Sequence, residues 1–149
     1  MAIFPLSVST NDLTCLLADD NQAMLEALDC FLRSEGVEVV GLATSGIDAL
    51  RLLETLPTKV IVVDFRLPDL DGIEVARRAR EIVRKKTAVV LYTSYANRRL
   101  VTDALDVGAR AVVLKDAPPT NLLRAIGAVT NGGIYIDPQL RFGPTGNGR

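Results

Sequence analysis

Residues 59–64 read KVIVVD, an apolar run that ends at a single acidic residue, Asp64. The same arrangement recurs along the chain: LTCLLA (13–18) precedes Asp19 and Asp20, AVVLY (88–92) precedes Thr93, and RAVVL (110–114) precedes Lys115. Short apolar runs bounded by polar residues and separated by helical patterns are typical of buried parallel strands. Because ligands of open α/β sheets bind beyond the carboxyl ends of the strands, we expect these polar side chains to meet at one edge of a sheet.

Strand and helix patterns alternate through the chain. We expect strands near 13–18, 37–42, 59–64, 88–93 and 111–114, and helices near 21–35, 46–56, 72–84, 97–107 and 118–131. Glycines follow three of these helices, as left-handed C-terminal caps require: Gly36, Gly108 and Gly132. Alternation with short loops requires right-handed crossovers and a parallel sheet covered on both faces. The predicted fold is therefore α/β, a flavodoxin-like (βα)5 doubly wound parallel sheet with strand order 2-1-3-4-5.

Length and composition fit one globular domain, since the chain has 149 residues, of which 48% are hydrophobic and 23% charged. We assign the domain to 13–131, with an N-terminal extension at 1–12 and a linker-like tail at 132–149. A net charge of −1 gives no electrostatic footprint for nucleic acid. No apolar stretch approaches the roughly 20 residues of a membrane span. The N-terminus lacks the features of a signal peptide, so we expect a cytoplasmic protein with no membrane partner.

The two cysteines point to a reducing compartment rather than to a disulfide bridge. Cys15 falls in the first predicted strand and Cys30 in the first predicted helix, so we expect both to be buried free thiols. The chain contains no histidine. A zinc site therefore has no credible set of ligands.

Three carboxylates at one sheet edge, those of Asp19, Asp20 and Asp64, repel one another unless a cation lies among them. With oxygen ligands only, the cation is Mg²⁺ before Ca²⁺, because two or three carboxylates leave room for the waters that Mg²⁺ retains. A carboxylate beside Mg²⁺, an ammonium (Lys115) and a hydroxyl (Thr93) is suited to accept a phosphoryl group as an acyl phosphate. Taken singly, Asp20 is better explained as a helix N-cap and Lys115 as a surface lysine. The whole set indicates a site.

The motifs LLADDN (16–21), VVDFRLPDLDG (62–72), VVLYTS (89–94) and VVLKDAP (112–118), with their spacing, resemble the receiver domain of bacterial two-component response regulators. The resemblance implies that Asp64 is the phosphoacceptor. It implies Mg²⁺ ligation by Asp19, Asp20, Asp64 and the backbone carbonyl of Arg66. It also implies that Thr93 and Lys115 contact the phosphoryl group. The expected donor is a cognate sensor histidine kinase, and the expected activity is that of a switch that catalyses only its own phosphorylation and dephosphorylation.

Residues 114–140 resemble the NarL/FixJ (LuxR)-type subfamily, whose members usually continue into a helix-turn-helix DNA-binding domain. Two outputs stay open. The favoured one is transcription regulation, with DNA bound only through a domain absent from this chain; the other is a stand-alone single-domain regulator that acts through protein contacts. Homodimerisation on phosphorylation is a further expectation, because the last helix carries an apolar stripe: Leu122, Leu123, Ile126 and Val129. The alternative is that this stripe packs on the sheet.

Two other classes of protein share part of the pattern. Haloacid-dehalogenase-like phosphatases also use an aspartyl nucleophile, but they need a second Asp at the position of Arg66. Flavodoxins and dinucleotide-binding modules need a loop whose N–H groups bind phosphate, whereas the first loop here is the acidic ADDN (18–21).

The chain departs from the usual receiver pattern at Val112, where the family often has an aromatic residue, and at Ser94, where it often has Ala or Gly. A short β-branched side chain cannot swing as an aromatic ring does. We therefore expect the Thr93–Ala96 loop to carry the conformational change.

Overall fold

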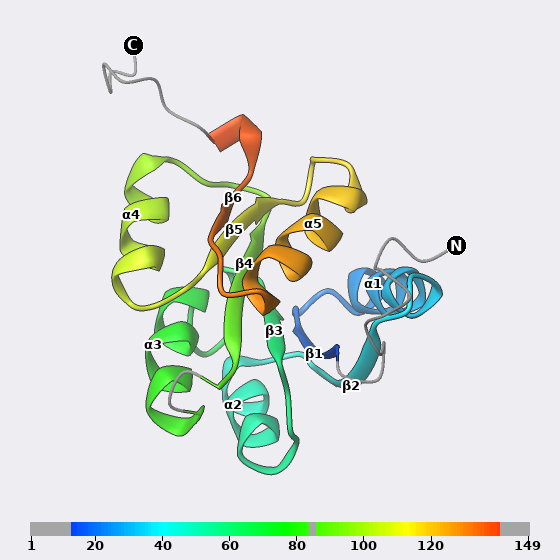
Figure 1. The fold of residues 1–149 in the computed structure, drawn as a ribbon. Coiled ribbons are helices and arrows are strands. Elements are labelled where there is room, and N and C mark those ends of the chain that lie inside the picture. The colour runs from blue at the N-terminus through cyan, green and yellow to red at the C-terminus, as the bar shows by residue number, and fades with distance from the viewer. Residues whose placement is uncertain (1–12, 84–85, 141–149) are drawn as a thin grey trace.

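The computed structural model describes residues 13–83 and 86–140, so the expected N-terminal extension and the end of the expected tail, 141–149, lie outside the described residues. The strands are β1 (Thr14–Ala18), β2 (Glu38–Ala43), β3 (Val60–Val63), β4 (Ala88–Thr93), β5 (Ala111–Leu114) and β6 (Tyr135–Ile136). The helices are α1 (Gln22–Ser34), α2 (Gly46–Thr55), α3 (Gly72–Val83), α4 (Arg98–Asp106) and α5 (Pro119–Thr130), followed by the short 3-10 helix η2 (Pro138–Leu140). Figure 1 shows these elements alternating around one sheet.

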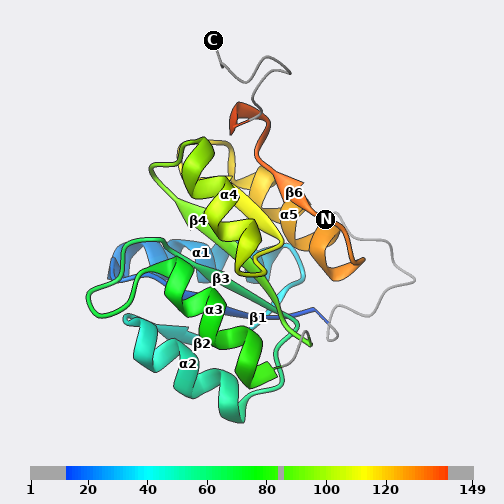
Figure 2. The same cartoon turned by 90° about the vertical axis from the view of Figure 1, so that its left-hand side faces the viewer.

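All strands of the sheet are parallel, in the order β2-β1-β3-β4-β5-β6. Helices α1 and α5 cover one face, whereas α2, α3 and α4 cover the other (Figures 1 and 2). Successive side chains of a strand enter opposite layers, so that Leu17 packs beneath α1 and α5, and Leu16 beneath the other helices. The predicted order 2-1-3-4-5 is confirmed, with one more strand added at its end.

Helix ends form where local sequence predicts them. The side chains of Asn21, Ser45 and Asn97 each accept a hydrogen bond from the backbone N–H three residues ahead and so cap α1, α2 and α4. The predicted C-terminal glycines Gly36, Gly108 and Gly132 have φ values of 90°, 103° and 86°. This left-handed conformation is easily adopted only by a residue without Cβ, which confirms the predicted helix ends.

The prediction for the cysteines is half right. Both are free thiols, and burial raises the pKa of Cys15 to about 12. Cys30 is exposed, because it lies on the side of α1 opposite to the stripe Leu25, Leu28 and Leu32 that faces the sheet. Assignment to a helix is not sufficient to bury a small residue; its position around the helix axis decides.

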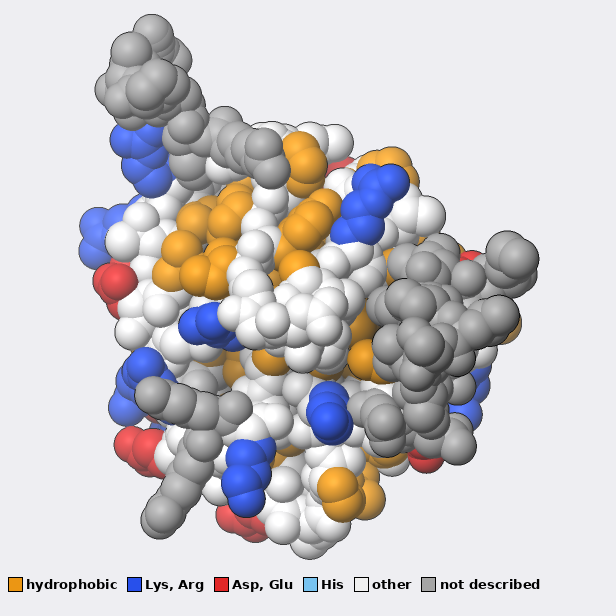
Figure 3. Space-filling model, viewed as in Figure 1, with side chains coloured by type: hydrophobic (Ala, Val, Ile, Leu, Met, Phe, Trp, Pro, Cys, Tyr) orange, Lys and Arg blue, Asp and Glu red, His pale blue; other side chains and the backbone are white. Residues whose placement is uncertain are grey.

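Residues 135–140 correct the predicted linker-like tail at 132–149. Tyr135 and Ile136 form β6 on the edge of β5, and η2 follows with Leu140 only 5% exposed. A strand of two residues is too short to give a periodic signal, so the five-strand prediction missed it. Figure 3 shows hydrophobic side chains gathered over α4 and β6, where Leu100, Leu105 and Ile136 are only partly buried.

The apolar stripe of α5 is part of the core. All four of its residues are buried in the cluster that joins α1, α5 and the sheet. The expectation that this stripe supports self-association is therefore wrong, and its alternative, packing on the sheet, is confirmed. In the part of the chain that the structure describes, no helix is long and apolar enough to cross a membrane.

Candidate functional site

The carboxyl ends of β1, β3 and β5 bring Asp19, Asp64 and Lys115 into direct contact. The Lys115 Nζ donates to Asp19 Oδ2 at 2.5 Å and to Asp64 Oδ2 at 2.9 Å. Register places the two carboxylates side by side, because the Asp64 backbone N–H donates to the carbonyl of Ala18 at 2.9 Å. The three side chains are between 4% and 11% exposed. The predicted convergence of these groups is confirmed.

Asp20 completes a cluster that fits a hard cation. One carboxylate oxygen from each of Asp19, Asp20 and Asp64 lies within 4.8 Å of the others. Asp20 is exposed, whereas the other two are buried, so the cluster opens to solvent on one side. A donor set of carboxylate oxygens with an open side suits Mg²⁺, which keeps several of its waters. The residues present therefore fit the expected metal.

Burial and the ion pair have opposite effects on the pKa values of Asp64 and Lys115. Burial raises the pKa of Asp64, and the Lys115 ammonium and the Arg66 N–H offset this only in part. Burial also acts to lower the pKa of Lys115, but its bonds to Asp19 and Asp64 outweigh burial and raise it. The ammonium thus stays charged and compensates two carboxylates that a low-dielectric site disfavours as anions.

The loop after β3 turns back tightly against the acceptor carboxylate. The Arg66 N–H donates to Asp64 Oδ1 at 3.3 Å, and the Gly72 N–H donates to the Phe65 carbonyl at 2.7 Å. A Cβ at Gly72 would lie 2.6 Å from Leu91 Cδ1 and 2.7 Å from the Asp64 carbonyl oxygen. Only glycine permits this approach. Arg66 therefore lies beside Asp64, and metal ligation by its carbonyl stays a prediction.

Thr93 lies at the same edge, but its hydroxyl is bonded within its own loop. The Oγ1 accepts from the Tyr95 N–H at 3.3 Å and donates to the Tyr95 carbonyl at 3.2 Å. The Thr93 carbonyl in turn accepts from the Lys115 N–H at 2.8 Å. The structure thus joins Thr93 to the backbone of Lys115 rather than to the carboxylates.

One buried acidic residue near this edge was not predicted. Asp137, directly after β6, is fully buried and accepts from the Leu114 N–H at 3.2 Å. The sequence pattern at Asp137 is the same as at the other strand ends: a polar residue follows an apolar run. Here the run is IYI (134–136). The run is too short to be distinguished from a loop without the structure.

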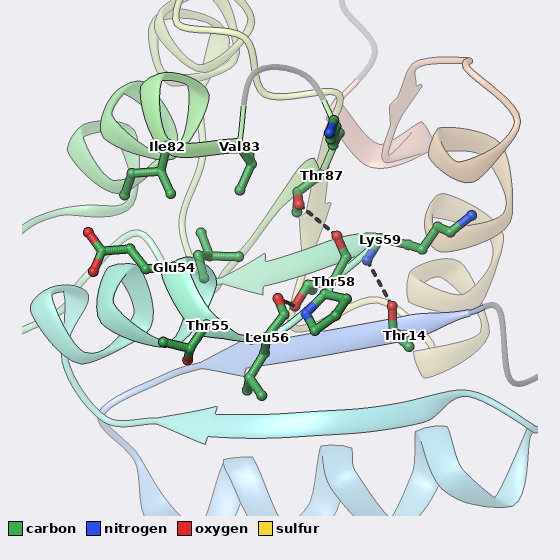
Figure 4. A pocket seen from close by; sticks show the side chains of 12 residues that line it. Thr14, Glu54, Thr55, Leu56, Thr58, Lys59, Ile82, Val83 and Thr87 are labelled. Carbon is green, nitrogen blue, oxygen red and sulfur yellow. Dashed lines mark hydrogen bonds between the residues drawn. The ribbon is translucent and has the colours of Figure 1, made fainter.

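A cavity of about 510 Å³ lies at the opposite edge of the sheet, between α2 and α3, and contains none of the predicted site residues (Figure 4). Its polar groups are used in strand pairing and turns: the Thr14 hydroxyl accepts from the Lys59 N–H, and the Thr87 hydroxyl donates to the Thr58 carbonyl (Figure 4). The convergent titratable groups, rather than this cavity, mark the functional edge.

Comparison with known proteins agrees with this geometry. The family model for the response regulator receiver domain matches residues 15–127. The chain belongs to this family. Receiver domains are signalling switches rather than classical enzymes, and the phosphatase and dinucleotide-binding alternatives are thereby set aside.

Relatives of this receiver domain are named as transcriptional regulatory proteins. It is 32% identical to the uncharacterized transcriptional regulatory protein YhcZ of Bacillus subtilis over 80% of this chain and 55% of the relative. It is 36% identical to the transcriptional regulatory protein PdtaR of Mycobacterium tuberculosis over 74% of this chain and 53% of the relative. The receiver domain thus spans about half the length of these relatives.

Solved structures of receiver domains superpose closely on this one. A LuxR-family response regulator from Aurantimonas sp. SI85-9A1 has a TM-score of 0.80 and 26% identity, over 85% of this chain and 91% of that chain. The signal receiver domain of the putative response regulator NarL from Mycobacterium tuberculosis has a TM-score of 0.74 and 31% identity, over 80% and 97%. These neighbours support the NarL/LuxR-type resemblance.

Proposed function

We propose that this receiver domain accepts a phosphoryl group from a cognate sensor histidine kinase onto Asp64, in a Mg²⁺-dependent reaction. The observation that carries the proposal is the contact of Lys115 with two buried carboxylates beside the exposed Asp20. Asp19, Asp20, Asp64 and the Arg66 carbonyl are the proposed metal ligands. Bound Mg²⁺ supplies compensation for the negative charge of the transferring group.

The chain's own residues have distinct proposed roles in the transfer. An Asp64 carboxylate oxygen attacks phosphorus, the new O–P bond forms, and the bond from phosphorus to the donor nitrogen breaks. Lys115 keeps Asp64 ionised before the reaction, and its ammonium then hydrogen-bonds a phosphoryl oxygen. Thr93 provides its hydroxyl to another phosphoryl oxygen after leaving Tyr95. The same groups serve hydrolysis, in which a water oxygen attacks phosphorus, the bond from phosphorus to the Asp64 oxygen breaks and inorganic phosphate leaves. The domain therefore catalyses only its own phosphorylation and dephosphorylation.

The proposed output is control of transcription, through a DNA-binding domain outside this chain. The support is the naming of the relatives and the share of their length that the chain spans. A stand-alone regulator that works by protein contacts is the second candidate, and homodimerisation on phosphorylation is compatible with both. A histidine kinase transfers phosphate to its partner in the cytoplasm, where we place this protein.

Labelling with acetyl phosphate tests the proposal. In Mg²⁺ the chain should take up one phosphoryl group, mapped to Asp64 by peptide mass spectrometry, and in EDTA it should take up none. Continuous turnover of phosphate esters would instead favour a phosphatase. Failure to bind beryllofluoride in Mg²⁺ would contradict the proposal directly.

Asp20→Ala should weaken Mg²⁺ binding by about tenfold or more, and Asp19→Ala should weaken it less. Both oxygens of Asp19 are already engaged, by the Asn21 N–H and by Lys115, whereas Asp20 makes no hydrogen bond or ion pair with the described residues. Asp20 is therefore free to ligate directly. Isothermal titration calorimetry measures the affinities, with Glu54→Ala as the control, because Glu54 is exposed and lies at the opposite edge of the sheet. Equal affinity in Asp20→Ala and the unaltered chain would count against the metal site.

Beryllofluoride should shift backbone amide resonances mainly in residues 93–100. Capture of the Thr93 hydroxyl by the phosphoryl mimic breaks its two bonds to Tyr95, a residue that is 59% exposed and whose phenol oxygen accepts a hydrogen bond from Asn97 Nδ2 at 3.3 Å. Val112 is fully buried within the core, so its methyl rotamer should not change. Amide and methyl NMR spectra with and without beryllofluoride measure both. A large Val112 rotamer change beside a silent 93–100 segment would reverse this assignment.

A further inference from the structure

Asp137 is a buried acid that the proposed phosphoryl chemistry does not use. Its carboxylate is fully buried, and both oxygens accept hydrogen bonds. The Oδ1 accepts from the Gln139 N–H at 3.0 Å, and the Oδ2 accepts from the Leu114 N–H at 3.2 Å and from Asn121 Nδ2 at 3.5 Å. One side chain thus joins η2, the end of β5 and the start of α5. Burying a carboxylate costs free energy unless it is hydrogen-bonded, so the hydrogen-bond partners of Asp137 indicate its role.

The carboxylate of Asp137 replaces a missing rung of the β5–β6 ladder. The N–H groups of Tyr135 and Asp137 donate to the carbonyls of Arg110 and Val112. If the parallel ladder continued, the Leu114 N–H would donate to the Asp137 carbonyl. That carbonyl instead accepts from the Leu140 N–H and closes the turn into η2. The Asp137 side chain therefore accepts a hydrogen bond from the Leu114 N–H, the last N–H of β5, while the backbone of Asp137 turns into η2.

This rung lies next to the residue that contacts Asp64. Leu114 immediately precedes Lys115, whose own N–H donates to the Thr93 carbonyl at 2.8 Å. The end of β5 is therefore held on one side by β4 and on the other by Asp137. The position of the Lys115 ammonium, 2.9 Å from Asp64 Oδ2, depends on both supports.

A second link ties this support to α5. Asn121, only 8% exposed, donates to Asp137 through Nδ2 and accepts from Arg124 Nη1 at 3.3 Å through Oδ1. The charges of Lys115, Asp19 and Asp137 all act on the phenol of Tyr92, whose pKa is raised chiefly by burial. Asp137 is thus hydrogen-bonded to the end of β5, to α5 and to η2.

We infer that Asp137 is a positioning residue for Lys115, and that through it the segment 135–140 senses the state of Asp64. The inference rests on the proposed function of Asp64 and adds a route from the site to the chain that follows residue 140. When the ammonium of Lys115 turns to a phosphoryl oxygen, the end of β5 moves against Asp137. The turn closed by Asp137 then transmits the change to the C-terminal side of the domain.

The test measures beryllofluoride affinity in saturating Mg²⁺ for the full chain and its variants. Asp137→Ala should weaken binding about tenfold, as loss of an outer support does at comparable sites. Gln139→Ala is the matched control, because Gln139 is exposed in the same turn and its side chain makes no hydrogen bond or ion pair with the described residues. It should bind as the unaltered chain does. In a Lys115→Met background, adding Asp137→Ala should change the affinity less than about twofold, since both act through one group.

Hydrogen exchange gives a second readout. Beryllofluoride should change the protection of the Asp137 and Leu140 amides in the unaltered chain but not in Asp137→Asn, which keeps the volume and replaces one acceptor oxygen by a donor. If Asp137→Ala does not fold, Asp137→Asn carries the affinity test. Unchanged affinity, or the same loss in the Lys115→Met background, would overturn the inference. Absence of beryllofluoride binding in the unaltered chain would overturn the proposed function instead.

Discussion

Asp64→Asn should abolish phosphorylation of this receiver domain by acetyl phosphate while leaving the fold intact. An amide oxygen carries no negative charge and does not form a stable acyl phosphate, so position 64 can no longer act as the nucleophile. The substitution nearly conserves volume, and Lys115 keeps its bond to Asp19. We expect uptake to fall by a factor of at least about 1,000, with the melting temperature close to that of the unaltered chain. Mass spectrometry after incubation with acetyl phosphate measures the uptake of phosphoryl groups. Circular dichroism measures the melting temperature.

Asp106→Asn is the control for this prediction, because Asp106 is exposed at the end of α4 and lies outside the carboxylate cluster. It should be phosphorylated as the unaltered chain is. Stoichiometric labelling of Asp64→Asn would show that another residue is the acceptor, and the first candidates would then be Asp19 and Asp20.

Sequence alone locates the main part of this site because the parallel sheet repeats one rule. A buried strand ends where a polar residue follows an apolar run, and the 2-1-3-4-5 order places the ends of β1 and β3 side by side. Asp19, Asp64 and Lys115 could therefore be predicted to meet. The rule does not predict the orientation of a hydroxyl group. The hydrogen bonds of the Thr93 hydroxyl with Tyr95 were therefore not predicted.

Short elements and single helix positions are where prediction from the sequence failed. Residues 135–140 are held by two ladder bonds and one buried carboxylate, and these contacts join positions more than 20 residues apart. No local periodicity encodes them. Cys30 was predicted to be buried because it falls within the first predicted helix, whereas only the stripe Leu25, Leu28 and Leu32 of α1 is buried. In both cases tertiary contacts, rather than the local sequence, determine the structure.

Lys115→Met should destabilise the metal-free domain by about 3 kcal/mol, because it leaves the buried carboxylates of Asp19 and Asp64 without their cation. The Lys115 side chain is 10% exposed, so solvent screens the loss only weakly. Urea unfolding in EDTA measures it, with the exposed Lys59→Met as control. Saturation with Mg²⁺ at about 100 times its dissociation constant should restore roughly 2.7 kcal/mol. Equal stability of Lys115→Met and the unaltered chain in EDTA would contradict the role given to this ammonium.

The same variant should show a characteristic pH dependence. Burial raises the pKa of Asp64 above its ordinary value of 3.8, and Lys115 partly offsets this, so its removal raises the pKa of Asp64 further. A group whose pKa is raised on folding contributes stability below its unfolded pKa and loses it as pH rises through the folded value. Metal-free Lys115→Met should therefore match the unaltered chain most closely below pH 3.8 and become progressively less stable than it as the pH rises above that value. Because Mg²⁺ favours the ionised carboxylate, its addition should remove this pH dependence. A loss of stability caused by lost packing would instead persist in Mg²⁺.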